Sequence, residues 1–500
     1  TVQLGASNVL TDTAALNVGN NASAAGTTFD LNGFSDTVFT LSLGGAAATT
    51  AGLTHSIVNT GGTGVLTLGG TVTYNAGGAS LNGQATISAD LASGATTRNF
   101  NVGDGSATDD LVITGALQAG GGFNVNGGGT MRLDNAANSH GTSQISGGST
   151  LKLGANSVLG TGSVNLNQGV AGTSTLDING KADAVGTGLN LSNATTTALG
   201  ATNQIIDSAG GGVLQLNGPV TYNAGAVGFN NGTTTISAAL DLNGTTRNFN
   251  INDSDQVTQD VIVSGVIQNN TGTAGLNKNN AGTLVLTGAN TYNGPTNVTA
   301  GILEVNNTSG SGTGSGTVTI TSTLTGDGSV TAASGNFVYI NGSMIVGATG
   351  ATAGSDFSIT TSGAASMVLG ATSFLNLDLW STTGTDQTSL LAAADMVRLF
   401  GSLDITSGAT LKLTNPNALT FQEGDMFRLF DWTGVTTRTG TFTEDFSAIT
   451  LSPGLNIDTS NLYTLGTVSV VAIPEPSRTL LLLLGGFSLL SRRRRAGQAC

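Results

Sequence analysis

The chain has 500 residues, of which 76 are glycine, only 9% are charged and 38% are hydrophobic. This ordinary hydrophobic content excludes a disordered chain, and the glycines follow no three-residue period, which excludes collagen. Threonine, valine and isoleucine alternate with glycine, asparagine and aspartate, a composition that favours short β-strands and turns over helices.

The formal charge of −14 is unevenly distributed along the chain. Five of the 15 basic residues and one of the 29 acidic residues lie beyond residue 473, so the preceding body carries −18. Because an acidic body repels nucleic acid, we expect no nucleic-acid partner. Two histidines, His55 and His140, and the single Cys500 leave little material for a zinc site or a Cys–His dyad, so no cofactor and no metal are expected.

The first part of the chain repeats itself at long range. The hexapeptide VTYNAG at 72–77 returns at 220–225, and other segments return at offsets between 147 and 150 residues. Constant offsets of this kind indicate a duplicated unit. We therefore predict two homologous units, at residues 1–152 and 153–310.

A finer pattern lies within each unit. Short runs such as 64–68 and 282–286 alternate apolar with small polar residues, and clusters of glycine, asparagine and aspartate separate them. This pattern predicts an all-β fold, a right-handed parallel β-solenoid in which each coil pairs its backbone with the next. At about 20–25 residues per coil, residues 1–380 would give roughly 15–19 coils and a rod on the order of 70–90 Å long. A string of β-sandwiches is the alternative.

One segment resembles a known family. Residues 280–307 read NAGTLVLTGANTYNGPTNVTAGILEVNN, which is similar to the autotransporter-associated β-strand repeat, also called the passenger-associated transport repeat. The family pattern is G-T-L-x-L-T-G-x-N-T-Y-x-G-x-T-x-V-x-x-G-x-L-x-V, and residues 129–153 form a degenerate copy of it in the first unit. The resemblance implies a β-helical passenger that is displayed at the cell surface.

The C-terminal third changes in composition. Residues 311–380 are rich in glycine, serine and threonine, which indicates either final thin coils or a linker. Residues 381–472 contain more phenylalanine, leucine, methionine and aspartate, and we expect a β-rich cap that covers the unpaired last coil. Segments 397–401 and 427–432 predict strands, although residues 390–399 fit one short helix as an alternative.

The tail at 473–495 has three parts. It begins with Pro474, Glu475 and Pro476 and ends with Arg492, Arg493, Arg494 and Arg495. Its middle is an apolar segment that contains Leu480, Leu481, Leu482, Leu483, Leu484, Phe487, Leu489 and Leu490. The prolines keep the motif extended, the apolar segment predicts a short transmembrane helix, and the arginines are expected to stay in the cytoplasm.

This arrangement closely resembles the PEP-CTERM sorting signal. The resemblance implies recognition by an exosortase, transient anchoring in the inner membrane, removal of the tail, and a bacterium that makes exopolysaccharide. Entry into this route requires a secretory signal, so we expect that a signal peptide has been removed or precedes Thr1.

Candidate catalytic and binding residues were sought in the repeat. His55 aligns with Asn203 and His140 with Tyr292, so neither histidine recurs between the units. Two pairs do recur, Arg98 with Asp110 and Arg247 with Asp260. They are candidates for a glycan contact, but a duplicated scaffold ion pair or corner hydrogen bond is the simpler interpretation. Residues 104–110 loosely resemble a calcium loop.

These observations predict a non-catalytic, exported structural or adhesive protein of the cell surface or the extracellular matrix. The alternatives are a polysaccharide-degrading or polysaccharide-binding β-helix protein and a calcium-dependent glycan-binding module. The expected partners are an exosortase, the inner membrane before processing, and exopolysaccharide.

Overall fold

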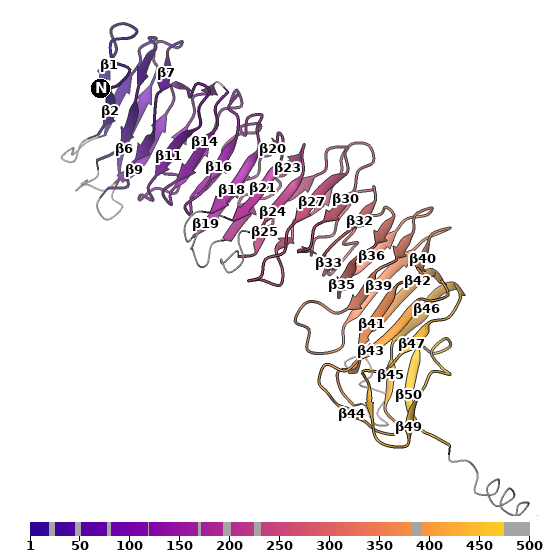
Figure 1. The fold of residues 1–500 in the computed structure, drawn as a ribbon. Coiled ribbons are helices and arrows are strands. Elements are labelled where there is room, and N and C mark those ends of the chain that lie inside the picture. The colour runs from indigo at the N-terminus through magenta and orange to yellow at the C-terminus, as the bar shows by residue number, and fades with distance from the viewer. Residues whose placement is uncertain are drawn as a thin grey trace, which may run out of the picture.

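The structure, a computed structural model, is an elongated stack of β-strands that runs from β1 near the N-terminus to β50 near residue 472 (Figure 1). It describes residues 1–19, 26–45, 52–77, 82–118, 120–168, 172–193, 202–224, 232–382 and 393–474. Nearly every pair of neighbouring strands is parallel and comes from successive coils. The predicted β-solenoid is therefore confirmed, while its right-handedness stays a prediction.

An 18-stranded parallel sheet, the first ladder, follows the whole rod. Each of its strands supplies one coil and pairs with the strands of the coils before and after it. In chain order its strands are β1 (Val2–Gln3), β3 (Thr27–Asp30), β6 (Leu53–Val58), β9 (Asn82–Ile87), β12 (Leu111–Ile113), β15 (Thr130–Leu133), β17 (Thr150–Leu153), β19 (Thr173–Asp177), β22 (Thr202–Ile206), β25 (Thr234–Ile236), β28 (Val261–Val263), β31 (Thr283–Leu286), β33 (Ile302–Val305), β35 (Thr323–Gly326), β38 (Ser343–Val346), β41 (Phe374–Asp378), β43 (Thr410–Thr414) and β47 (Thr443–Asp445).

A second parallel ladder lies on the other side of the core. Its strands are β2 (Ala15–Val18), β5 (Thr40–Leu43), β8 (Val72–Tyr74), β11 (Arg98–Val102), β14 (Phe123–Asn126), β16 (Ser143–Ile145), β18 (Val164–Gln168), β21 (Leu189–Asn193), β24 (Val220–Asn223), β27 (Arg247–Ile251), β30 (Leu276–Asn279), β32 (Thr296–Val298), β34 (Val318–Ile320), β37 (Val338–Ile340) and β40 (Ser366–Leu369). A branch of β36 (Ser329–Ala332) and β39 (Asp356–Thr361) joins it at β42 (Met396–Ile405), which is followed by β46 (Phe430–Thr439).

A third ladder is present only over the wide coils and is divided into two four-stranded pieces. The pieces are β4 (Asp36–Val38), β7 (Val65–Leu68), β10 (Asp90–Ala92) and β13 (Leu117–Gln118), and then β20 (Ala182–Val185), β23 (Val213–Leu216), β26 (Ala239–Asp241) and β29 (Ile267–Gln268). Between and after them the coils are narrow. The 149-residue repeat is thus a group of wide coils followed by a group of narrow ones.

Coil length varies more than the predicted 20–25 residues. It is 19 residues from Thr283 to its ladder partner Ile302, and 36 residues from Phe374 to Thr410. Loops of different length change the outline of a coil but leave the ladder spacing unchanged, because each coil needs only its strands in register. The β-sandwich alternative is wrong, since sandwiches are built from antiparallel sheets and these ladders are parallel.

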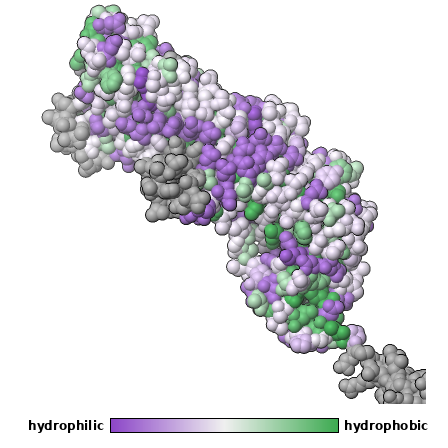
Figure 2. Space-filling view, viewed as in Figure 1, coloured by the Kyte–Doolittle hydropathy of each residue, from purple (hydrophilic) through white to green (hydrophobic). Residues whose placement is uncertain are grey.

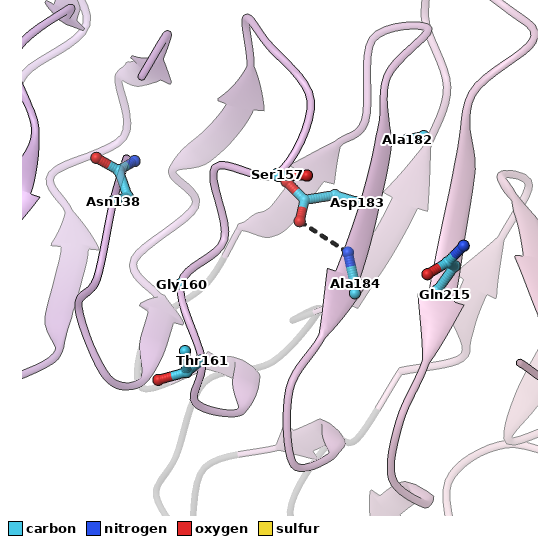
Figure 3. Close-up of a pocket in the computed structure, with 8 residues that line it drawn as sticks. All are labelled: Asn138, Ser157, Gly160, Thr161, Ala182, Asp183, Ala184 and Gln215. Carbon is cyan, nitrogen blue, oxygen red and sulfur yellow. Dashed lines mark hydrogen bonds between the residues drawn. The ribbon is translucent and has the colours of Figure 1, made fainter. Parts of the chain in front are cut away.

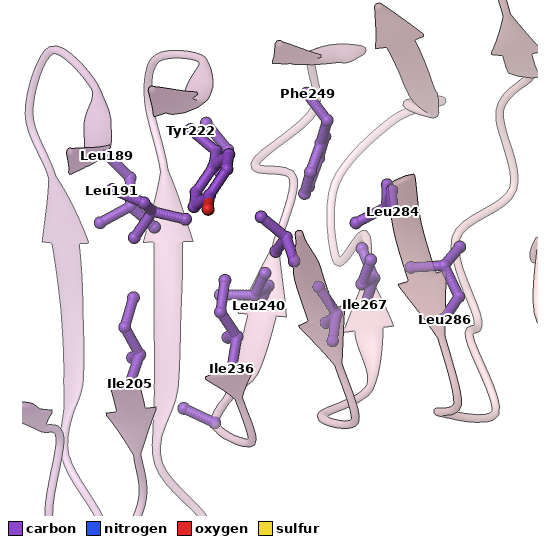
Figure 4. Close-up of a cluster of buried hydrophobic side chains, with 14 of the residues drawn as sticks. Leu189, Leu191, Ile205, Tyr222, Ile236, Leu240, Phe249, Ile267, Leu284 and Leu286 are labelled. Atoms are coloured by element: carbon purple, nitrogen blue, oxygen red, sulfur yellow. The ribbon is translucent and has the colours of Figure 1, made fainter. Parts of the chain in front are cut away.

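The core lies between the ladders and is continuous along the rod. Strands such as β39 alternate half-buried and buried residues, so that every second side chain points inward. Figure 4 shows such inward side chains from successive coils, among them Leu189, Tyr222, Phe249 and Leu284, all of which are fully buried. Each fully buried side chain of this size contributes about 1.5–3 kcal/mol to stability.

Three corners of the solenoid share the sequence Asp-x-Asn-Gly and begin at Asp30, Asp177 and Asp241. At the second corner, Asn179 has a φ of 47° and donates its backbone N–H to Asp177 Oδ1 (2.9 Å). The same carboxylate accepts from Ser208 of the next coil, through its backbone N–H (3.1 Å) and its Oγ (2.7 Å). Each corner therefore joins two coils while it turns the chain.

The parallel ladders continue beyond residue 380, through β42, β43, β46 and β47. The part that covers the last coils is a small antiparallel sheet of β45 (Met426–Arg428), β50 (Thr467–Ala472) and β49 (Leu455–Asp458). Beside it, β44 (Thr420–Phe421) pairs with β48 (Thr450–Leu451). The helix alternative is wrong for residues 396–399, which begin the long strand β42; residues 390–392 lie outside the described residues.

The tail is described only to Pro474, which is exposed and follows β50. The predicted motif residues Glu475 and Pro476, the apolar segment and the four arginines lie outside the described residues. Within the part of the chain that the structure describes, no helix has the length and apolar character needed to span a membrane.

Candidate functional site

The repeated arginines brace the corners before the second ladder. Arg98 donates from Nε to the carbonyl of Ser93 (3.2 Å) and from Nη1 to that of Gly69 (2.7 Å). Arg247 does the same with the carbonyls of Leu242 (3.0 Å) and Asn217 (2.8 Å). Both guanidinium groups thus join their own coil to the preceding one.

The repeated aspartates also bind backbone groups. Asp110 accepts from the N–H groups of Gly105 (2.7 Å) and Thr130 (2.8 Å). Asp260 accepts from the N–H groups of Ser254 (2.8 Å) and Thr283 (2.7 Å). In the described residues, neither aspartate forms an ion pair with the arginine of its unit, so the structure does not bring the two together as a clamp.

A buried lysine lies near Asp260, and the sequence analysis did not find it. Lys278 is fully buried in β30 and its Nζ donates to the carbonyls of Asn279 (2.9 Å), Asn280 (2.7 Å) and Ala300 (3.1 Å). Burial lowers the pKa of Lys278 to about 8. Burial also raises the pKa of Asp260 to about 6, against the opposing effect of its hydrogen bonds.

This lysine takes the place of an apolar residue. Lys278 pairs with Phe249 in the ladder as Val125 pairs with Phe100 in the first unit. The only signal in the sequence is this exchange within the aligned repeat. Raised carboxylate and lowered lysine pKa values mark functional sites in many proteins, but here all the hydrogen bonds of both groups go to backbone atoms.

Both histidines are buried and are held by hydroxyl groups. His140 Nε2 lies 2.9 Å from Ser143 Oγ, and its aligned counterpart Tyr292 places its hydroxyl 2.6 Å from Thr296 Oγ1. His55 Nδ1 lies 2.8 Å from the hydroxyl of Thr27. Burial lowers the pKa of His55, and it lowers that of His140 to about 4. Both side chains are therefore packing residues of the first unit.

The predicted calcium loop is used in other contacts. Asp109 forms ion pairs with Arg132 and with Lys152, the latter at 3.3 Å, while Asp110 binds backbone groups. Among the described residues, no group of three or more His, Cys, Asp or Glu side chains is arranged to hold a metal ion.

A cleft of about 250 Å³ lies where the third ladder is interrupted, before β20 (Figure 3). Its buried carboxylate, Asp183, accepts from the N–H groups of Val158 (2.7 Å), Leu159 (3.2 Å) and Ala184 (2.7 Å). Asn138 at its edge donates to the carbonyl of Val158 (2.9 Å). These polar side chains hold the loop that replaces the missing strands, which gives the cleft a structural role.

The segment around residue 290 forms one narrow coil. Asn290 is buried, accepts from the N–H of Ile267 (2.7 Å) and donates to the carbonyl of Gly312 (2.6 Å), so it joins three coils. Gly301 has a φ of +67°, and a Cβ there would lie 2.5 Å from the carbonyl oxygens of Asn280 and Gly282. The asparagine and the glycine of this motif are therefore required by the turn geometry.

The comparisons with known proteins agree with this geometry. The profile of the passenger-associated transport repeat matches residues 276–305, the coil made by β30 to β33, and this confirms the predicted repeat at 280–307. A repeat of this description implies an exported protein at the cell surface. None of the curated proteins matches the chain.

Proposed function

We propose that the chain is a non-catalytic structural and adhesive rod of the cell surface or the extracellular matrix. The observation that carries this proposal is the passenger-associated repeat, which forms one coil of a continuous parallel solenoid. An extended rod presents long, regular side faces, which suits spacing and adhesion. The contacts of Asp110 and Asp260, both directed to backbone N–H groups, argue against the polysaccharide-degrading alternative; depolymerisation of any glycan by the purified protein would overturn this part.

We further propose that an exosortase sorts the protein through its PEP-CTERM tail after transient anchoring in the inner membrane. The order of the motif, apolar segment and arginines supports this proposal. Ile473 is 54% exposed and Pro474 is exposed directly after the antiparallel cap. A protease or transpeptidase can therefore approach this end of the folded body.

Deletion of residues 473–500 tests the sorting proposal. We expect the truncated protein to lose membrane processing and to leave the envelope fraction, as measured by immunoblots of fractionated cells. The matched control is deletion of residues 496–500, which keeps all three parts of the signal and should be processed normally. Identical processing and location of the 473–500 deletion and the full chain would contradict exosortase sorting but would leave the surface rod in place.

A further inference from the structure

The outer face of the second ladder carries in-register rows of amide side chains from β11 to β34. In the central row, eight outward residues from Asn99 to Asn279 follow one another from coil to coil, and each is asparagine, glutamine or threonine. A flanking row runs from Asn248 to Thr319 and contains two further asparagines. These outward residues are half-buried or exposed, and we call them the amide face.

The amides hydrogen-bond to one another in one direction. Asn124 Nδ2 donates to Asn99 Oδ1 (3.2 Å), and Asn279 Nδ2 donates to Asn250 Oδ1 (2.9 Å). The donor belongs to the later coil in each case, and the flanking row has the same sense. A side-chain amide has two N–H donors and two acceptor positions. The ladder uses one of each, which leaves one donor and one acceptor per asparagine on the outer side.

The amide face is uncharged, although the body of the chain carries −18. The charged residues in the strands β11 to β34 that the structure describes are Arg98, Arg247 and Lys278, and all three are turned to backbone carbonyls. Figure 2 shows hydrophilic residues gathered along this side of the rod, over the strands from β11 to β27. Its ligand therefore has to be polar and needs no charge of its own.

The face is also regular. The pairings from β11 to β34 run without a register shift, so successive amides are one strand spacing apart. At about 4.8 Å per coil, the eight residues of the central row span roughly 30–35 Å. A long row of identical weak contacts binds a long polymer of similar units by multivalency, even when each contact alone is weak.

We propose that the amide face binds a neutral polysaccharide lengthwise. Sugar hydroxyls both donate and accept hydrogen bonds, as the outer half of each amide requires, and a pyranose ring is close in length to one coil spacing. Acidic glycans and a second copy of this chain fit less well, because the −18 body repels both. The proposal specifies the adhesive part of the proposed function and rests on it in that respect.

The test is affinity electrophoresis of the purified protein in native gels that contain a neutral glucan, mannan or galactan, with polygalacturonate as the acidic comparison. The variant carries Asn124→Val, Asn190→Val and Asn277→Val, because valine suits a strand and offers no hydrogen bond. Asn456→Val, at an exposed position of β49 in the cap, is the matched control. Circular dichroism and the melting temperature show whether each variant is folded.

We expect at least one neutral polysaccharide to retard the wild-type protein, the triple variant to bind at least about tenfold more weakly, and the control to bind as the wild type does. If the triple variant is unfolded, Asn277→Val alone is measured and should weaken binding by about twofold or more. The proposal is overturned if no neutral polysaccharide retards the wild type, if the face variants bind equally well, or if only polygalacturonate binds. Concentration-dependent dimers that the variant abolishes, without glycan binding, would also overturn it. Each of these failures would leave export and sorting untouched.

Discussion

At the scale of single residues, His140 is a buried base that the fold keeps neutral. It is 2% exposed, its ring lies 4.7 Å from that of Phe123, and in the described residues its Nδ1 has no hydrogen-bond partner. Burial lowers its pKa from 6.5 to about 4. The unfolded chain therefore binds this proton more readily than the folded one, and acid favours unfolding.

The substitution His140→Gln should remove this acid sensitivity. In the wild type, this group's contribution to stability is intact above about pH 6.5, falls between about pH 6.5 and 4, and is lost below that, a change of about 3 kcal/mol. Urea unfolding near pH 7 and near pH 4 gives the difference for each protein, and the variant's should be smaller by about 3 kcal/mol. All other groups titrate in both proteins, so an equal difference would show that His140 is not the cause.

The sequence identified the repeated residues but not their partners. Arg98 and Asp110 stand out because they recur as Arg247 and Asp260, and the corner hydrogen bond was the simpler interpretation. Their partners are backbone groups of neighbouring coils, and these are fixed only by the length of each coil. Lys278 was missed for a similar reason, since three carbonyls that satisfy its ammonium group come from corners that no local pattern predicts.

At the scale of elements, the Asp-x-Asn-Gly corner depends on a backbone conformation that disfavours most side chains. Asn179 has a φ of 47°, and its Nδ2 donates to the carbonyl of Leu153 in the preceding coil (2.9 Å). Asn179→Val and Asn179→Gly both lose that bond, but only valine keeps the strain of a branched side chain in the left-handed region. We expect the valine variant to be less stable than the glycine variant by about 1–2 kcal/mol.

Hydrogen exchange in β19 and β22, the strands that flank this corner, measures the difference locally. The valine variant should exchange faster in both strands than the glycine variant, while strands far along the rod remain unchanged. Equal exchange in the two variants would mean that the turn tolerates a β-branched residue and that the asparagine is there for its side-chain bond alone.

Strands were predictable from the sequence because period-two alternation is local, and β31 and β33 lie where the pattern places them. Coil boundaries were harder to predict. A coil of 19 residues and one of 36 place their strands at the same ladder spacing, so alternation carries no record of loop length. The amide face has the same origin, because its rows appear only after the register of ten coils is known.

At the scale of the whole molecule, a solenoid coil contacts mainly its two neighbours, so stability is a chain of local interfaces and not one core. The contacts of the ladders follow this rule, since the strands of each pair belong to adjacent coils. The cap is different in construction, with antiparallel pairs and aromatic packing such as that of Phe421 on Phe427, whose centroids are 5.3 Å apart. It should therefore unfold without the rod.

Val468→Asp tests this independence. Val468 is 2% exposed in β50, the central strand of the cap, and a buried unpaired carboxylate costs several kcal/mol. Hydrogen exchange should rise throughout residues 420–474 but stay unchanged in β27 to β34, and light scattering should increase because the uncovered last coil offers free strand edges. Ala472→Asp, at the exposed end of the same strand, is the control and should do neither. Loss of protection along the whole rod in the Val468 variant would mean that the molecule folds as one cooperative unit, with the cap as its support.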